Sequence, residues 1–184
     1  VMKRNWSLSV GVLALVLLVA CDEDRTTGPP GQEAFQRYVA IGTSVSMGIQ
    51  SDGVYYATQQ HAWPALLAHQ AFAPSFTQPL ITGPGCYSPL IAPLQFQRRL
   101  SGAQYPNILP SDQTCSLFGS ITLPTNDVAI DGATTYAALR ITVDSTNAAP
   151  ANVESDQRKR LYRAVLAPKK SQVSSMVAQN PTLV

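Results

Sequence analysis

The chain has 184 residues, of which 45% are hydrophobic, with 13 Lys and Arg against 11 Asp and Glu. This length and composition fit one domain that buries a core. The near balance of charge, without a basic patch, argues against a nucleic-acid-binding protein, and we expect no nucleic-acid partner.

The N-terminus has the features of an export signal. A basic start is followed by an uncharged, mostly apolar run at 8–20, which is too short to span a bilayer. The run ends in Leu-Val-Ala before Cys21, an arrangement typical of a lipobox. We predict that residues 1–20 are a lipoprotein signal peptide, that Cys21 is lipidated, and that 21–35 form a flexible tether. An ordinary secretory signal, in which Cys21 has no such role, is the alternative.

Lipidation would place the protein in the cell envelope, anchored to a membrane and facing the periplasm or the cell exterior. Disulfides persist there, and Cys86 and Cys115 remain as a pair once Cys21 is assigned to lipid. We predict a disulfide between them that closes a loop of about 30 residues and contributes roughly 3–4 kcal/mol. Two free thiols are the alternative. The two histidines do not lie at ligand spacing from these cysteines, so we expect no metal site and no cofactor.

The first half of the chain predicts a strand, a helix and a long insertion. Residues 37–41 are predicted to form a strand, in which 38–41 are apolar on successive positions, as in the middle of a parallel sheet. A polar loop at 50–60 precedes a helix at 63–71, which has a proline in its first turn. Residues 74–124 contain eight of the 14 prolines and are predicted to form a Pro-rich insertion with few regular elements.

The second half continues the alternation of strands and helices. The predicted elements are, in chain order, a strand at 127–130, a helix at 133–141, a polar linker at 144–152, a helical region at 155–180 divided by Pro168, and the start of a third strand at 181–184. This order predicts a three-layer α/β/α fold, in which a parallel sheet lies between two layers of helices. The basic cluster from Arg158 to Arg163 is interpreted as the solvated face of a helix.

A candidate nucleophile follows the first predicted strand. Residues 40–48 read AIGTSVSMG, which places Ser44 in a turn just beyond the strand end. A serine held there has access to substrate and has backbone N–H groups around it for an oxyanion. A purely structural turn, or a helix N-terminus that binds an anion, is the alternative.

Three segments resemble a known enzyme family. The segment Gly-Thr-Ser-Val-Ser at 42–46 is similar to the first block of the SGNH hydrolases, also called GDSL esterases or lipases, with Thr43 in place of the family's Asp. The segment at 62–68 resembles their W-P-x-x-L helix, and NDVAIDGATT at 126–135 resembles their N-x-A-x-x-G-A-T turn. The resemblance implies a flavodoxin-like sheet, Ser44 as nucleophile, and the backbone N–H groups of Ser44 and Gly132 as oxyanion hole.

The resemblance covers 36–184, the N-terminal part of such a domain. It implies that a Gly-x-Asn-Asp block and an Asp-x-x-His block would follow Val184, so we expect this 184-residue chain by itself to be inactive. It assigns no role to His61 or His69. Asp127 and Asp131 flank the turn within the segment 126–135, and we expect them to cap the helix that follows it.

The expected function is that of a lipid-anchored serine esterase or lipase. Its partners would be a small-molecule, lipid or acylated-glycan ester and the membrane that holds the anchor. The insertion at 74–124 would form one wall of the substrate pocket. A non-catalytic lipoprotein that binds a glycan or protein partner on the same fold is the alternative. A structural lipoprotein, with the cystine loop as an interaction surface, is a third interpretation.

Overall fold

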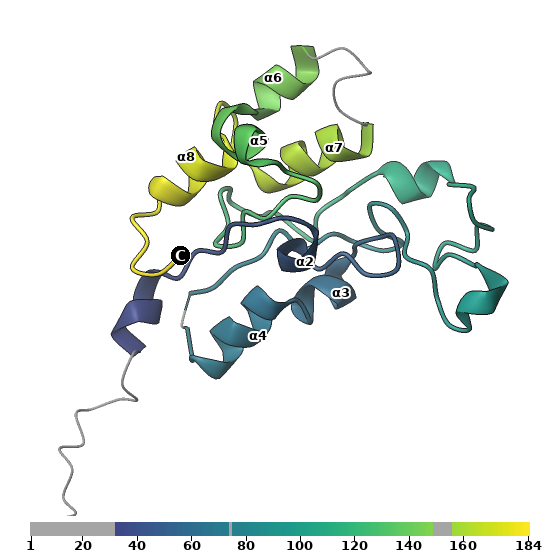
Figure 1. Ribbon diagram of the computed structural model, residues 1–184, viewed down its shortest axis with the longest axis horizontal. Helices are drawn as coiled ribbons and strands as arrows, with labels where there is room; N and C mark the ends of the chain where they lie inside the picture. Colours follow the sequence, from purple (N-terminus) through teal and green to yellow (C-terminus); the bar gives the residue numbers. More distant parts are fainter. Residues whose placement is uncertain (1–31, 74, 149–155) are drawn as a thin grey trace, which may run out of the picture. The chain divides into compact units, whose positions relative to one another are not determined.

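The structure is a computed structural model that describes residues 32–73, 75–148 and 156–184 (Figure 1). The predicted signal peptide, Cys21 and residues 22–31 of the predicted tether lie outside these described residues. The last tether residues belong to a 3-10 helix, η1 (Gln32–Arg37). None of the described helices is long and apolar enough to cross a membrane.

Short helices make up the regular structure of the described residues. The seven α-helices are α2 (Ser44–Met47), α3 (Tyr56–Gln60), α4 (Trp63–Gln70), α5 (Thr135–Arg140), α6 (Val143–Ala148), α7 (Asp156–Val165) and α8 (Gln172–Val177). Two further 3-10 helices, η2 (Leu94–Phe96) and η3 (Pro110–Gln113), lie in the Pro-rich region. Helices α2 and α3 pack against α4, while α5 packs against α8 and α6 against α7 (Figure 1).

The predicted three-layer α/β/α fold with a parallel sheet is wrong, because the described residues contain no β-strand. The segments predicted as strands form only isolated parallel bridges, between Tyr38 and Leu183 and between Ala40 and Asp127, and backbone hydrogen bonds next to these bridges, such as Ile130 N–H to the Gly42 carbonyl oxygen, extend no ladder. Residues 38–40 and 127–130 are buried, but they do not form a continuous ladder with each other.

Side chains also form hydrogen bonds with the backbone of these segments. The buried amide of Gln172 donates through Nε2 to the carbonyl oxygens of Gly42 (3.0 Å) and Val128 (2.8 Å). The carboxylate of Asp127 accepts the N–H of Ala129 at 3.0 Å. These bonds satisfy buried polar backbone groups, as burial requires, without a neighbouring strand.

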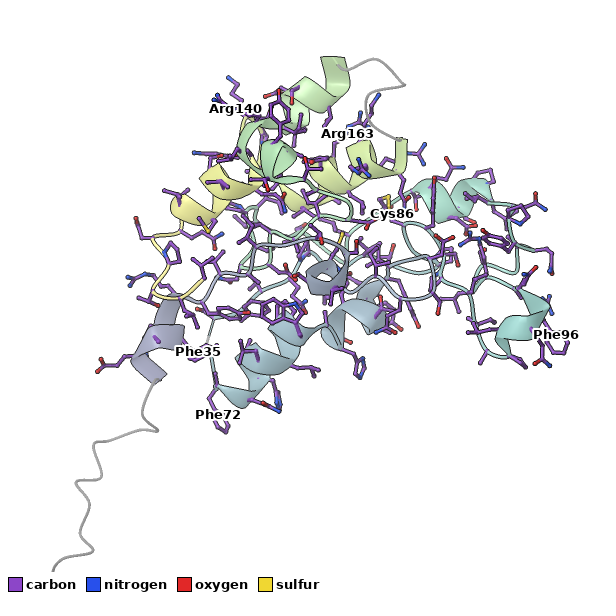
Figure 2. All side chains as sticks on the ribbon, viewed as in Figure 1. Phe35, Phe72, Cys86, Phe96, Arg140 and Arg163 are labelled. Carbon is purple, nitrogen blue, oxygen red and sulfur yellow. A yellow bond between two sulfur atoms is a disulfide. The ribbon has the colours of Figure 1, made fainter. Side chains whose placement is uncertain are left out.

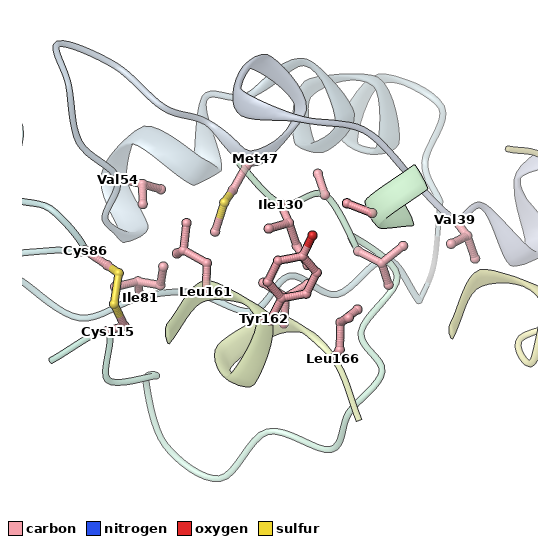
Figure 3. Packing of buried hydrophobic residues seen from close by; sticks show 14 residues of the cluster. Val39, Met47, Val54, Ile81, Cys86, Cys115, Ile130, Leu161, Tyr162 and Leu166 are labelled. Atoms are coloured by element: carbon pink, nitrogen blue, oxygen red, sulfur yellow. A yellow bond between two sulfur atoms is a disulfide. The ribbon is translucent and has the colours of Figure 1, made fainter. Parts of the chain in front are cut away.

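The main core lies between α2 and α7. Four side chains are buried there and face one another (Figure 3). They are Met47 of α2, Ile130 of the buried segment 127–130, and Leu161 and Tyr162 of α7. Burying one such side chain stabilises the fold by about 1.5–3 kcal/mol. This packing holds α7 against the segment that leads to Gly132.

Most predicted helices are confirmed, with two omissions. Helix α4 coincides with the prediction at 63–71, α5 lies within 133–141, and α7 and α8 are separated at Pro168 as expected. Helix α3 lies in the predicted polar loop, and α6 overlaps the predicted linker at 144–152. Both omitted helices have five or six residues and depend on neighbouring elements rather than on their own propensity.

The Pro-rich region is held by a disulfide and a buried arginine. The predicted disulfide between Cys86 and Cys115 is present, and Cys86 is fully buried (Figure 2). Arg99, which is 2% exposed, donates to the carbonyl oxygen of Ser88 at 2.7 Å and forms an ion pair with Asp52. Phe96 points outward at the far end of the region (Figure 2).

Candidate active site

Ser44 is the first residue of α2 and is half-buried. The turn that holds it depends on the preceding glycine, because a Cβ at Gly42 would lie 2.7 Å from the Cβ of Ser46. Ser46 in turn accepts a hydrogen bond from Trp63 Nε1 of α4 at 3.1 Å. Helix α4, which begins with Trp63 and Pro64, therefore supports the serine turn through Ser46.

Gly132 lies in the second turn, between the buried segment 127–130 and α5. Its φ of +65° is in the left-handed region that favours glycine. The turn is anchored by Ile130, whose N–H donates to the carbonyl oxygen of Gly42 at 3.1 Å. Because Gly42 lies two residues before Ser44 and Ile130 two residues before Gly132, this bond places the two turns side by side.

A direct hydrogen bond joins the two turns. The Ser44 hydroxyl donates to Oδ1 of Asp131 at 2.5 Å, across 87 residues of sequence. The expectation that Asp131 caps α5 is wrong, since the Thr134 hydroxyl accepts the N–H of Ala137 as the cap. The carboxylate is directed at the serine instead, a role that sequence reasoning did not assign to it.

The two adjoining turns also contain the backbone N–H groups of the predicted oxyanion hole. Among the described residues, no acceptor is hydrogen-bonded to the N–H of Ser44 or to that of Gly132. The residues beside them, Thr43, Val45 and Thr134, are exposed, so the site opens to solvent. The arrangement contains a hydroxyl, a carboxylate that orients it and two unoccupied N–H donors. Acyl transfer through a serine uses such a hydroxyl and such donors together with a general base.

Thr43 occupies the place where the resembling family has an acidic residue. It is exposed, and its side chain makes no capping hydrogen bond to α2. Thr43 therefore contributes to the turn that carries Ser44 through its backbone, whose carbonyl oxygen accepts the Met47 N–H at 2.9 Å.

The interpretation of the basic cluster on α7 as a solvated face is incorrect. Lys159 is buried, Arg158 and Arg160 are half-buried, and only Arg163 is exposed. Arg158 approaches the second turn: a Cβ on Gly132 would lie 2.9 Å from Cζ and Nε of its guanidinium. The sequence does contain a sign of this burial. Arg158 precedes the buried Leu161 by three residues, and residues at that spacing lie on the same face of a helix.

Asp127, at the start of the second buried segment, has the most perturbed carboxyl group. Burial raises its pKa from 3.8 to about 7, although hydrogen bonds from the Ala129 N–H and the Gln78 amide act in the opposite direction. Together with burial, its charge helps to raise the pKa of Tyr38 to about 12. It is 2% exposed, which makes it a structural group rather than one that contacts substrate.

Neither histidine lies in the turns that contain Ser44 and Gly132. His61 follows α3 and is exposed, with Nδ1 2.7 Å from the carbonyl oxygen of Ala57, and His69 is in the last turn of α4. In the described part of the chain, no group of three or more His, Cys, Asp or Glu side chains is placed to hold a metal ion.

No protein-family model, curated protein or solved structure matches this chain. The roles of Ser44 and Gly132 and the relation to SGNH hydrolases therefore stay predictions that rest on the motifs and on the geometry of the two turns.

Proposed function

We propose that the protein is a lipid-anchored serine ester hydrolase of the SGNH type, acting in the cell envelope. The observation that carries the proposal is the hydrogen bond from Ser44 to Asp131. It joins two segments that resemble separate motifs of one enzyme family, and it places Gly132 next to the serine. A chance resemblance of two short segments would not require them to meet in space.

In the proposed reaction, Ser44 Oγ attacks the ester carbonyl carbon and loses its proton to a general base, for which the resemblance implies a histidine. The backbone N–H groups of Ser44 and Gly132 stabilise the oxyanion. Collapse of this intermediate breaks the bond to the alcohol, which leaves with a proton, and water then hydrolyses the acyl-serine. Asp131 orients the Ser44 hydroxyl before the attack.

The test is covalent labelling of the full-length protein with a fluorophosphonate probe, which reacts only with an activated serine. We expect labelling of the wild type and none of Ser44→Ala. Thr43→Ala is the matched control, since it removes the neighbouring exposed hydroxyl, and it should be labelled like the wild type. Absence of labelling in a folded wild type, or equal labelling of Ser44→Ala, would refute the proposal and leave the non-catalytic binding protein as the better interpretation.

Anchoring by Cys21 is proposed from the sequence, and the disulfide between Cys86 and Cys115 is compatible with an oxidising compartment. If the proposal is right, Cys21→Ser should move the protein from the membrane fraction to the soluble fraction. A variant that stays with the membrane would contradict lipid attachment at this residue.

A further inference from the structure

The loop at 91–109 in the Pro-rich region exposes large apolar side chains. Six of them are 40–57% exposed: Ile91, Leu94, Phe96, Leu100, Tyr105 and Leu109. Figure 2 shows Phe96 on the opposite side of the domain from Phe35 and Phe72, and Figure 1 shows the loop away from α2, which carries Ser44. A group of exposed apolar side chains marks a surface that contacts a ligand, a protein or a membrane. The place of the loop in the fold favours a contact other than substrate binding.

The loop has a preformed shape, because the buried Arg99 holds its base. The guanidinium donates to the carbonyl oxygens of Ser88 at 2.7 Å and Asn107 at 3.2 Å. It also forms an ion pair with Asp52. A surface that is already ordered loses little conformational entropy when it binds. The apolar side chains of the loop are therefore presented to a partner without a prior rearrangement of its base.

Hydrogen bonds within the loop satisfy polar groups near its tip. The Ile91 N–H donates to the carbonyl oxygen of Arg98 at 2.9 Å. The Phe96 N–H donates to the carbonyl oxygen of Pro93 at 3.0 Å, and the Phe96 carbonyl oxygen accepts from Gln104 Nε2 at 2.8 Å. Backbone groups that enter an apolar medium need such internal partners, since water no longer serves them. The tip therefore meets a requirement for contact with a lipid bilayer.

The charge of the loop fits an anionic surface. The sequence contains no Asp or Glu between Asp52 and Asp112. Asp112 is fully buried, and Asp52 is paired with Arg99. Arg98 is exposed, so the loop presents a positive charge beside its apolar side chains. Anionic lipid headgroups attract such a cation, while the acyl chains below them accept the apolar side chains next to it.

We propose that the loop at 91–109 is a membrane-contact site that binds the surface of a bilayer containing anionic lipids. Leu94 and Phe96 enter the boundary between headgroups and acyl chains, to a depth of about 5–10 Å, and Arg98 binds lipid phosphates. A contact this small is reversible, as that of a single acyl chain is. The loop therefore orients a protein that is already anchored. The inference rests on the lipid anchor of the proposed function and adds to it the orientation of the domain on the membrane.

The experiment places a tryptophan on the loop of the full-length protein in vesicles. Phe96→Trp adds a fluorophore at the tip, and Phe72→Trp is the matched control, because Phe72 is 71% exposed on another part of the domain. The vesicles contain phosphatidylglycerol and a phosphatidylcholine with brominated acyl chains, which quench a tryptophan that reaches them. Acrylamide quenches a tryptophan in water. The wild-type protein supplies the background emission, flotation shows whether each protein is bound to the vesicles, and melting temperatures establish that each variant is folded.

We expect the emission added by Phe96→Trp to shift to shorter wavelength, to be quenched by the brominated lipid and to be protected from acrylamide. The emission added by Phe72→Trp should be quenched by acrylamide and not by the lipid. Arg98→Gln, added to Phe96→Trp, should lower the ratio of inserted to free loop about fivefold, which corresponds to about 1 kcal/mol for one basic residue at an anionic surface. Arg140→Gln, which removes an exposed charge from the end of α5, should leave the ratio unchanged.

The outcomes separate the loop from the anchor. A folded protein that does not float with the vesicles refutes the lipid anchor, and the inference with it. Equal quenching of Phe96→Trp and Phe72→Trp in a floating protein overturns the inference alone, because the loop then has no contact of its own with the bilayer. Protection of Phe96→Trp from acrylamide without quenching by the brominated lipid overturns it in favour of a protein contact, such as a second copy of this chain. A ratio that Arg98→Gln leaves unchanged overturns the requirement for anionic lipid.

Discussion

Replacing Asp127 with asparagine should change how the stability of the protein depends on pH. The carboxyl group is 2% exposed, and burial raises its pKa from 3.8 to about 7. An unfolded chain restores the ordinary value. Between these two values the folded state binds a proton that the unfolded state does not bind, so stability falls as the pH rises.

The size of the effect follows from the two pKa values. A shift of one unit is worth 1.36 kcal/mol, so a rise from 3.8 to about 7 corresponds to about 4 kcal/mol. The stabilisation is fully present below pH 3.8, is lost between pH 3.8 and about 7, and does not change further above that. This loss is a large part of the 5–15 kcal/mol by which domains are commonly stable.

Asparagine is the matched replacement because it keeps the shape and cannot ionise. Its carbonyl oxygen still accepts the Ala129 N–H, and its amide faces Gln78, which donates to the carboxylate in the wild type. Any cost of rearranging Gln78 is the same at every pH. It therefore cancels when the variant is compared with the wild type across the pH range.

The assay is urea unfolding of the wild type and Asp127→Asn at pH 4, 5.5, 7 and 8. We expect the free energy of unfolding of the wild type, relative to the variant, to fall by about 3–4 kcal/mol from pH 4 to pH 8. Direct titration of the Asp127 carboxyl carbon by NMR should give a midpoint near neutral pH. A difference between the two proteins that does not vary with pH would refute the reasoning and mean that the carboxylate is solvated or paired.

Two further predictions concern the second turn and the disulfide. Gly132→Ala and Gly119→Ala should each lower the free energy of unfolding by roughly 1–2 kcal/mol, because the φ values are alike, at +65° and +64°, and a Cβ on Gly132 meets only the guanidinium end of the flexible Arg158 side chain. A loss in urea unfolding that is several kcal/mol larger for Gly132→Ala would contradict this. Cys86→Ser combined with Cys115→Ser should cost about 3–4 kcal/mol, from the 29-residue separation that the disulfide closes. A reductant should destabilise the wild type and leave the double variant unaffected.

The sequence predicted helices better than it predicted the relation between extended segments. Helix α4 carries its own signals, with Pro64 in the first turn and apolar residues at helical spacing. Residues 38–40 of the first predicted strand are buried, as are residues 127–130 of the second. Whether such segments pair along their length depends on non-local hydrogen bonds, and here the Gln172 side chain takes the carbonyl oxygen of Val128 and shares that of Gly42 with the Ile130 N–H. No local pattern shows that a glutamine 44 residues beyond Val128 will do so.

Local sequence patterns likewise predicted only part of the candidate site, because they do not show contacts between distant segments. Ser44 and Gly132 were selected from local motifs, since a serine or glycine that ends an apolar segment can be recognised in the sequence. Asp131 and Arg158 were assigned other roles, because a local rule places an acidic residue near a helix start and a basic cluster in solvent. Their contacts with Ser44 and Gly132 arise only when segments 26 or more residues apart are packed together.

The two turns of the candidate site are kept together by one backbone carbonyl. The oxygen of Gly42 accepts the Ile130 N–H at 3.1 Å and the Gln172 amide at 3.0 Å. The first bond aligns the segment that ends in Ser44 with the segment that ends in Gly132, and the second joins both to α8. The hydrogen bond from Ser44 to Asp131 then closes the arrangement. The geometry proposed for catalysis therefore depends on a buried side-chain amide and two short bridges, so a substitution at Gln172 would disturb the site from a helix that does not contact substrate.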